Sequence, residues 1–388
     1  MYDSISDTDQ TLLKNSTELG HIKLHLEFTG SGSEYFRIWA GNLLLTLLTL
    51  GLYYPWAKVR RLRYFYGNIQ VDGDPLDFHG DPRTVGKGCL RVATLFSLSA
   101  LAVWLSPAAG LAALLAVVGL WPALYWLRLQ FHLAHTSWRG LRFRFKGSLR
   151  GAYAATVPLC VTALALFTLA LVALHSTLAH QWLRITAAVV VLCALAWLPW
   201  QIWNLKNYQH MHYALGHLQT QFKATPANFY RYSFKLYAIG FSILASAAAL
   251  SGAERWTCNL QFEALGSALA LAGAVAAMPA GCLDTLASSL AVFIGIGAYA
   301  TSRSQNLVWT QTGNRSIRFI SALRFRPLLW LKVKNALLIV LTLGLYWPFA
   351  AIAVTRMRVE AIRIKTRIDP NTLVGSVRAA EAGATKNK

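Results

Sequence analysis

The chain has 388 residues, of which 55% are hydrophobic and only 14% are charged, and its formal net charge is +21. About a quarter of the residues of a soluble domain are charged, so this composition excludes an ordinary soluble protein and indicates an integral membrane protein. The basic residues lie in the connections between apolar runs, which is the pattern of membrane topology. We therefore expect no nucleic-acid partner.

The first residues do not resemble a secretory signal, because 1–23 are polar and acidic, without a basic segment that leads into an apolar one. We expect a disordered N-terminus at 1–23. A single repeat-built membrane domain is predicted at 24–368, and a flexible tail at 369–388.

Six apolar runs approach or exceed the ~20 residues that cross a bilayer. These runs lie at 88–105, 108–127, 152–174, 184–203, 233–250 and 285–301. Three further apolar segments lie at 38–57, 264–278 and 327–350. The predicted fold class is an all-α polytopic membrane protein with internal repeats and about six to nine membrane segments. Small cytoplasmic β-strand elements are expected between these segments.

The basic residues predict the orientation of the chain. Arg and Lys are concentrated at 128–150 and 303–334, whereas the connections 106–109, 175–183 and 251–261 are nearly uncharged. Cytoplasmic loops carry the excess of Lys and Arg, so we expect the three uncharged connections to be periplasmic. Membrane lipids, including anionic headgroups, are the expected partners of the basic segments.

A repeating unit runs through the polar segments. Phenylalanine follows a proline by 23 positions in three pairs: Pro55 and Phe78, Pro122 and Phe145, and Pro199 and Phe222. A small residue stands two positions after each phenylalanine, and the same signature occurs at Phe28 and Phe319. The residues before these phenylalanines alternate as short strands do. Because isolated short strands are marginal in water, we expect all five strands to meet in one small cytoplasmic sheet.

The most specific repeat joins the two ends of the chain. Residues 42–57 return as residues 335–350, with 11 of 16 positions identical, including Thr-Leu-Gly-Leu-Tyr-x-Pro. The glycine and proline in each copy could turn the chain back inside the membrane. The basic flanks of the second copy favour such a re-entrant segment or a steeply tilted one, whereas the acidic N-terminus favours an ordinary crossing at 38–57. Both interpretations remain open.

These motifs carry a resemblance to a known family. The segments that carry it are Phe28-x-Gly30, Asn42-x-Leu-Leu, Thr49-Leu-Gly-Leu-Tyr53-x-Pro55-Trp56-Ala57-Lys58 and Asn306-Leu-Val-Trp309. They resemble the YjgN family of bacterial inner-membrane proteins, over about residues 24–368. The resemblance implies a multi-pass inner-membrane protein and implies no reaction. The second copy departs from the pattern, with Phe349 in place of Trp56 and Ala351 in place of Lys58.

Candidate binding residues come from the two copies and from one lone carboxylate. They are Asn42, Thr49, Gly51, Tyr53, Pro55, Trp56, Asn335, Thr342, Gly344, Tyr346, Pro348 and Asp284. Asn42 and Asn335 are expected to hydrogen-bond between helices. Asp284 is expected to cap a helix, with a proton or cation site as the alternative.

No catalytic constellation can be recognised, so we expect no enzyme, cofactor or metal site. The Asp72, Asp74, Asp77 and Asp81 cluster is best explained by turns, with a divalent-cation site as the alternative. The His132/His135 and His210/His212 pairs are interpreted as interfacial residues rather than metal ligands.

Two function classes remain. The repeats and the Gly/Pro-broken segments favour a transporter or channel. The scarcity of polar residues inside the membrane segments favours a non-transporting scaffold or lipid-contact protein.

Overall fold

The computed structural model describes residues 22–175, 181–216, 218–251 and 280–367, with 369, 371, 372, 374 and 375. The expected N-terminal tail up to residue 21, most of the expected C-terminal tail and the apolar segment 264–278 lie outside the described residues. The strands are β1 (Ile22–Phe28), β2 (Ile69–Val71), β3 (Asp74–Phe78), β4 (Thr136–Trp138), β5 (Leu141–Phe145), β6 (Tyr213–Leu215), β7 (Leu218–Gln219), β8 (Gln221–Phe222), β9 (Thr312–Gly313), β10 (Ile317–Ser321) and β11 (Ile362–Thr366). The helices are α2 (Gly32–Leu48), α3 (Tyr54–Gly67), α4 (Pro82–Leu105), α5 (Pro107–Ala134), α6 (Leu149–His175), α7 (Gln181–Met211), α8 (Pro226–Ser251), α10 (Ala280–Thr310), α11 (Phe325–Leu341) and α12 (Trp347–Glu360).

All of these strands belong to one sheet, in the order β7-β6-β5-β4-β3-β2-β1-β11-β10-β9-β8. Every pairing between neighbours is antiparallel. The two edge strands are consecutive in the chain, since β7 ends at Gln219 and β8 begins at Gln221. The single residue Thr220 therefore joins the two edges, and the sheet curls back on itself into a nearly closed barrel.

This barrel corrects the predicted fold class. The prediction that the strands ending at Phe28, Phe78, Phe145, Phe222 and Phe319 share one sheet is confirmed. The prediction of an all-α protein with small strand elements is wrong, because the 11-stranded sheet is a structural layer of its own. Strands β2, β4, β6 and β9 have only two or three residues each. Such short strands carry too little alternation to be recognised in a sequence.

Three phenylalanines of the repeat, Phe28, Phe78 and Phe145, pack over the glycine that follows two positions later. A Cβ atom added to Gly80 or Gly147 would lie 2.4 Å from the ring of Phe78 or Phe145, and one added to Gly30 would lie 2.8 Å from Phe28. The position after the small residue then begins a helix. Ser31 and Asp81 accept the capping hydrogen bonds of α2 and α4 through their side chains. The signature is thus a strand end fused to a helix start.

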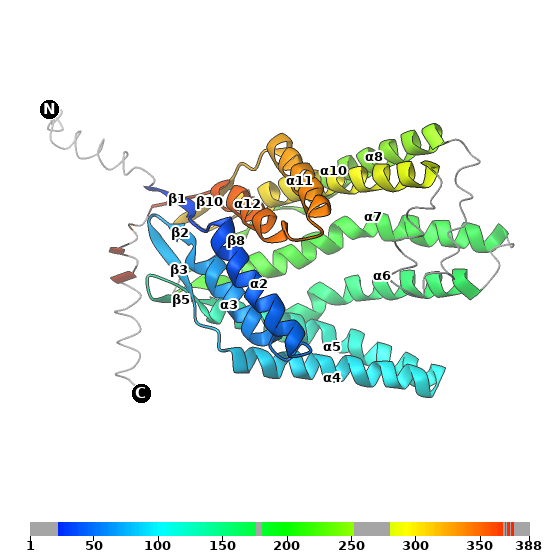
Figure 1. The fold of residues 1–388 in the computed structure, drawn as a ribbon, viewed down its shortest axis with the longest axis horizontal. Helices are drawn as coiled ribbons and strands as arrows, with labels where there is room; N and C mark the ends of the chain where they lie inside the picture. The colour runs from blue at the N-terminus through cyan, green and yellow to red at the C-terminus, as the bar shows by residue number, and fades with distance from the viewer. Residues whose placement is uncertain are drawn as a thin grey trace, which may run out of the picture.

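Five helix pairs leave the barrel on one side, each between two strands of the sheet (Figure 1). Four helices in the described part are long and apolar enough to cross a membrane: Pro82–Leu105, Pro107–Ala134, Leu149–Ala170 and Ile185–Met211. They confirm four of the predicted apolar runs as long helices. The runs at 233–250 and 285–301 lie in α8 and α10, which pack side by side, and their crossing stays a prediction.

The first and last helix pairs are shorter than the others (Figure 1). Helix α2 has 17 residues, or about 25 Å, less than the ~30 Å of bilayer hydrocarbon. The pair α2–α3 begins after β1 and ends before β2, and these strands are neighbours in the sheet. A single crossing at 38–57 is therefore excluded, and the chain returns to the face that it left. The same holds for α11–α12, between the neighbouring strands β10 and β11.

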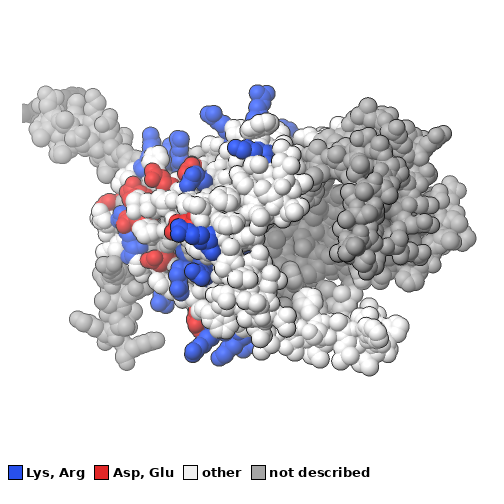
Figure 2. Space-filling model, in the orientation of Figure 1, with Lys and Arg blue, Asp and Glu red and all other residues white. Residues whose placement is uncertain are grey.

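The two ends of the chain close the architecture. Strand β1 pairs with β11, and α2 packs against α12. Phe349 of α12 stacks on Phe36 of α2, with ring centroids 5.6 Å apart, and leaves room only for the glycine at position 32. Phe349, the counterpart of Trp56 in the first copy, thus lies at the junction of the two ends. Figure 2 shows the charged side chains gathered over the barrel end, while the described helical surface is mostly uncharged.

Candidate binding site in the barrel

The two copies of the Thr-Leu-Gly-Leu-Tyr-x-Pro motif form the same turn. Thr49 Oγ1 accepts a hydrogen bond from the Tyr53 N–H at 3.0 Å, and Thr342 Oγ1 accepts one from the Tyr346 N–H at 3.0 Å. Gly51 and Gly344 both have φ near +92°, a conformation that favours glycine. The predicted equivalence of the two copies is confirmed.

The motif prolines and rings complete these turns. Pro55 and Pro348 stand in the first turns of the returning helices α3 and α12, where proline costs no hydrogen bond. Tyr53 stacks on Trp56, and Tyr346 stacks on Phe349. None of the described motif residues lines the chamber found in the barrel, so their assignment to binding stays a prediction.

The paired asparagines lie inside these short helix pairs. Asn42 and Asn335 are both buried. Asn42 Nδ2 donates to the Ala57 carbonyl of the adjacent helix at 3.5 Å, as a residue that joins helices should. Within the described residues, Asn42 Oδ1 and Asn335 Nδ2 find no hydrogen-bond partner. Each short pair therefore holds one unsatisfied polar atom in its interior.

The carboxylate candidates have different outcomes. Asp284 lies inside α10, which begins at Ala280, so its expected role as the capping residue is wrong. Its side chain is outside the described part of the structure. In the aspartate cluster, Asp72 forms the turn between β2 and β3 with φ of 55°, and Asp81 caps α4. Asp74 pairs with Arg139 at 2.5 Å. The turn interpretation of this cluster is confirmed for Asp72, whereas Asp81 is a helix cap.

The histidine pairs are structural in three of the four positions described. His135 Nδ1 bonds the Phe131 carbonyl and His212 Nδ1 bonds the Tyr208 carbonyl, both at 2.8 Å. These equivalent bonds end α5 and α7 in the same way. His132 packs on Phe78 and Phe131. His210 differs, because it lines the interior of the barrel.

The barrel holds a partly open chamber of about 830 Å³, within the range of small-molecule sites. Its wall inside the sheet is apolar, and is made by inward-facing residues of nine strands. They are Leu24, Leu26, Val71, Leu76, Trp138, Phe143, Leu215, Leu218, Ile317, Phe319 and Ile364. Three of these, Leu24, Val71 and Trp138, also form a buried cluster. Alternation along short strands directs these side chains inward and their neighbours outward.

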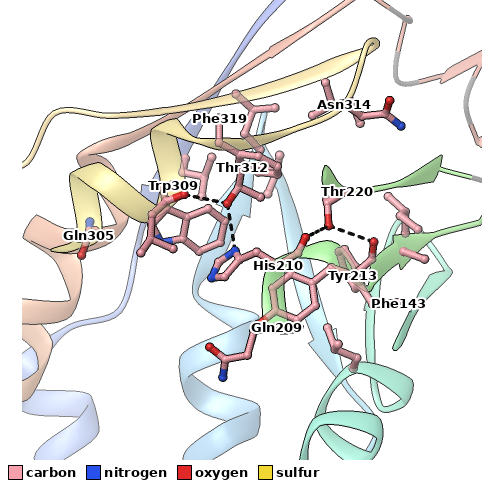
Figure 3. A pocket seen from close by; sticks show the side chains of 18 of the residues that line it. Phe143, Gln209, His210, Tyr213, Thr220, Gln305, Trp309, Thr312, Asn314 and Phe319 are labelled. Atoms are coloured by element: carbon pink, nitrogen blue, oxygen red, sulfur yellow. Dashed lines mark hydrogen bonds between the residues drawn. The ribbon is translucent and has the colours of Figure 1, made fainter. Parts of the chain in front are cut away.

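The wall toward the helices is polar, and comes from α7, α10 and α12. Lys206, Gln209 and His210 line it from α7, Thr301, Ser304 and Gln305 from α10, and Arg358 from α12. Figure 3 shows the rings of His210, Tyr213 and Trp309 close together at this wall; His210 lies 5.1 Å from Tyr213 and 5.7 Å from Trp309 between centroids. Burial raises the pKa of Tyr213 to about 12, so its hydroxyl is neutral at cellular pH.

Hydrogen bonds fix the seam where the two sheet edges meet. Thr220 Oγ1 donates to the His210 carbonyl at 2.5 Å, and Asn314 Nδ2 donates to the Gln219 carbonyl at 2.8 Å. Thr312 Oγ1 lies 2.7 Å from the Val308 carbonyl and 3.0 Å from His210 Nδ1 (Figure 3). Because the Thr312 hydroxyl donates its one proton to Val308, His210 Nδ1 must be the donor to Thr312. The neutral ring then keeps Nε2 as an acceptor.

Two cations, Lys206 and Arg358, line the polar wall, and a third, Lys332, lies behind it against Thr301. Arg358 Nε donates to Gln305 Oε1 at 2.8 Å, and Lys206 Nζ donates to Gln209 Oε1 at 3.0 Å. Lys332 Nζ donates to the Gly297 carbonyl at 2.9 Å and to Thr301 Oγ1 at 3.1 Å. The charge of Arg358 acts on both lysines. Among the described residues that line the chamber there is no Asp or Glu.

The comparisons place this architecture in a family. The family model described as a bacterial protein of unknown function, DUF898, matches residues 23–387. The chain belongs to this family. Similar curated relatives of the chain are named inner membrane protein YjgN, in agreement with the expected resemblance.

The similarity to those relatives covers only part of each chain. The relative from Escherichia coli O157:H7 is 28% identical over 228 residues, which are 58% of this DUF898 chain and 56% of the relative. The relative from Salmonella typhimurium strain LT2 is 33% identical over 129 residues, 33% of each chain. The relative from Escherichia coli K12 is 35% identical over 132 residues, also 33% of each. No solved structure matches significantly.

Proposed function

We propose that this DUF898 chain is an inner-membrane transport protein that binds its solute in the barrel chamber. The observation that carries the proposal is the continuity of helix α7. Its segment Ile185–Met211 is apolar and long enough to cross a membrane, and its last turns place Lys206, Gln209 and His210 in the chamber wall. One helix thus connects the membrane to an internal site of ligand size. The inner-membrane names of the relatives support the location.

The repeated helix pairs add support to the transport proposal. Transporters are often built from internal repeats with broken helices around a central site. Here five helix pairs extend from one side of the barrel, and two of them turn back at Gly51 and Gly344. The role is proposed to be non-enzymatic, and His210, whose Nδ1 is bonded to Thr312, is proposed to bind a ligand rather than to act as a catalytic base. A nucleophile with a free adjacent base is not part of the described wall.

The second candidate is a non-transporting lipid-contact protein. It is favoured by the tips of the two short helix pairs, where the side chains of Leu50 and Leu343 are 94% and 95% exposed. Exposed leucines at a turn fit the hydrocarbon of one leaflet. Basic residues follow in α3, namely Lys58, Arg60, Arg61 and Arg63, and these suit anionic headgroups.

Flux through liposomes separates the two candidates. Purified full-length protein would be reconstituted with internal carboxyfluorescein, and separately with NBD-labelled phosphatidylglycerol assayed by dithionite. Transport predicts movement of at least one probe, and loss of that movement in Ala300→Trp, which fills the chamber wall. The matched control is Ala108→Trp, at an exposed position on α5. If both probes stay in place in the reconstituted wild-type protein, the transport proposal is overturned in favour of the lipid-contact role.

A further inference from the structure

The chamber in the barrel has two ends of opposite chemistry. The sheet end is lined by aliphatic and aromatic side chains such as Leu24, Val71 and Phe143. The helix end carries Lys206 and Arg358, with Gln305 between α10 and α12. A purely polar solute would leave the sheet end unfilled, and a purely apolar one would leave the cations unpaired. From this division we infer that the ligand is an acidic membrane lipid, which places its anionic head at the cations and its acyl chain inside the sheet. The inference rests on the proposed function and names its substrate class.

The cations are arranged to receive an anion rather than to stabilise the fold by ion pairs. Each of Lys206, Lys332 and Arg358 bonds only neutral acceptors in the described structure: an amide oxygen, a backbone carbonyl and a hydroxyl. Three positive charges that act on one another without a counter-charge repel. An anionic group that binds among them would relieve this repulsion and gain charge-assisted hydrogen bonds. The side chain of Arg358 remains accessible and lines the chamber.

The order of the lining residues along α10 and α7 determines the orientation of the bound lipid. On α10, Thr301, Gln305 and Val308 line the chamber one turn after another toward the sheet. The two polar residues lie farther from the sheet than the apolar Val308. On α7, Lys206 precedes His210 by one turn, and β6 begins at Tyr213. The anionic head therefore lies at the helix end, next to the membrane part, and the acyl chain points into the barrel.

Binding to purified full-length protein in a non-ionic detergent tests this inference. The probes are oleate, oleyl alcohol and acetate, which separate head and tail. Oleate should bind at least about tenfold more tightly than oleyl alcohol, because a charged hydrogen bond is worth that factor or more. Acetate should not compete at equal concentration. Equal affinity for oleate and oleyl alcohol would overturn the inference, and so would competition by acetate as strong as that by oleate.

Charge-removing variants then locate the head. Lys206→Met keeps most of the side-chain stem, and Arg358→Gln keeps a polar group. Each should weaken oleate binding by about tenfold and leave oleyl alcohol binding unchanged, which also shows that the variant is folded. Arg363→Gln, at an exposed position of β11 outside the chamber lining, is the matched control and should have no effect. Unchanged oleate binding in both variants would contradict the site.

The outcomes are distinct from those of the flux experiment. A protein that moves a probe but shows no preference for oleate would keep the transport proposal and overturn the ligand class. A protein that binds oleate through Lys206 and Arg358 but moves neither probe would keep the ligand class and overturn transport.

Discussion

Gly51 and Gly344 adopt the same backbone conformation, with φ of +92° at both positions, although they lie at opposite ends of the chain. The preceding residues, Leu50 and Leu343, also match each other, with positive φ values of 50° and 49°. The Gly51 N–H donates to Thr46 and the Gly344 N–H donates to Ile339, both at 2.8 Å. The two motifs therefore form the same type of turn. In each short helix pair, this turn directs the second helix back to the barrel.

Replacing Gly51 with alanine should destabilise the protein by about 1 kcal/mol, since φ is positive there. Nothing lies within 4 Å of the added Cβ, so the cost comes from the backbone and not from a clash. Gly41→Ala in the same helix pair is the control. Position 41 also has open space, is helical without positive φ, and should gain about 0.5–1 kcal/mol. Thermal unfolding in detergent measures both changes, and equal effects would contradict the turn.

Gly51→Leu tests the same position with a larger side chain, against Leu45→Ile as the volume-conserving control. Gly51→Leu should lower the yield of folded protein and Leu45→Ile should not. Similar thermal stability of the two variants would show that the motif has no special role.

Cysteines at the two turns should be shielded from water. Leu50→Cys and Leu343→Cys lie at highly exposed tips, which we place in the hydrocarbon of one leaflet. A membrane-impermeant maleimide should label neither from either side. Arg142→Cys on β5 should be labelled from the cytoplasm only, and Ala108→Cys from the periplasm only. Labelling of Leu50→Cys from the periplasm would show that the first pair reaches the other side. Periplasmic labelling of Arg142→Cys would reverse the orientation.

Gly147→Ala should destabilise the fold by about 1–3 kcal/mol through overpacking. The added methyl group would lie 2.4 Å from the ring of Phe145 and 2.7 Å from the Tyr208 hydroxyl. Both partners are buried and packed together. Gly88→Ala, which meets nothing within 4 Å, is the control and should be neutral or stabilising. Equal melting temperatures of the two variants would contradict the packing.

Two tryptophans make equivalent bonds to the repeat. Trp126 Nε1 donates to the Gly147 carbonyl at 2.7 Å, and Trp203 Nε1 donates to the Ala224 carbonyl at 2.8 Å. Trp126→Phe and Trp203→Phe should each cost about 1–3 kcal/mol, because a carbonyl loses its partner. Trp104→Phe, at a side chain that is 91% exposed, should cost less than about 0.5 kcal/mol. Denaturation in matched detergent would compare the three, and a cost at Trp104 as large as at Trp126 would reject the bond's role.

The sequence predicts much of the repeat, but it does not predict the closure of the sheet into a barrel or the chamber inside it. The Phe-x-small signature finds the strand ends because a ring must pack over a glycine or alanine, which constrains the two positions together. A helix begins directly after the signature, where Ser31 and Asp81 cap α2 and α4. Serine and aspartate are common capping residues, so these helix starts could be predicted from the sequence. Gly51 and Pro55 predict a turn for the same local reason.

The chamber could not be predicted, because the residues that line it lie far apart from one another in the sequence. Lys206 and Arg358 come from helices far apart in the chain, and only closure of the sheet brings them to one wall. That closure depends on β7 and β8, strands of two residues each, which show no periodicity. The one hint was a lysine and a histidine near the end of an otherwise apolar helix. At Asp284 the local sequence was misleading. It predicted a helix cap, but the residue lies inside α10, four positions after Ala280.

The most direct measurement is a cryo-electron microscopy map of the full-length protein purified from its own membranes without added lipid. We predict elongated density in the barrel, between Leu24 and Leu215 at the sheet end, that ends in a head group within hydrogen-bonding distance of Lys206 and Arg358. Density that fills the chamber with side chains, or shows only water there, would contradict a ligand site in the barrel.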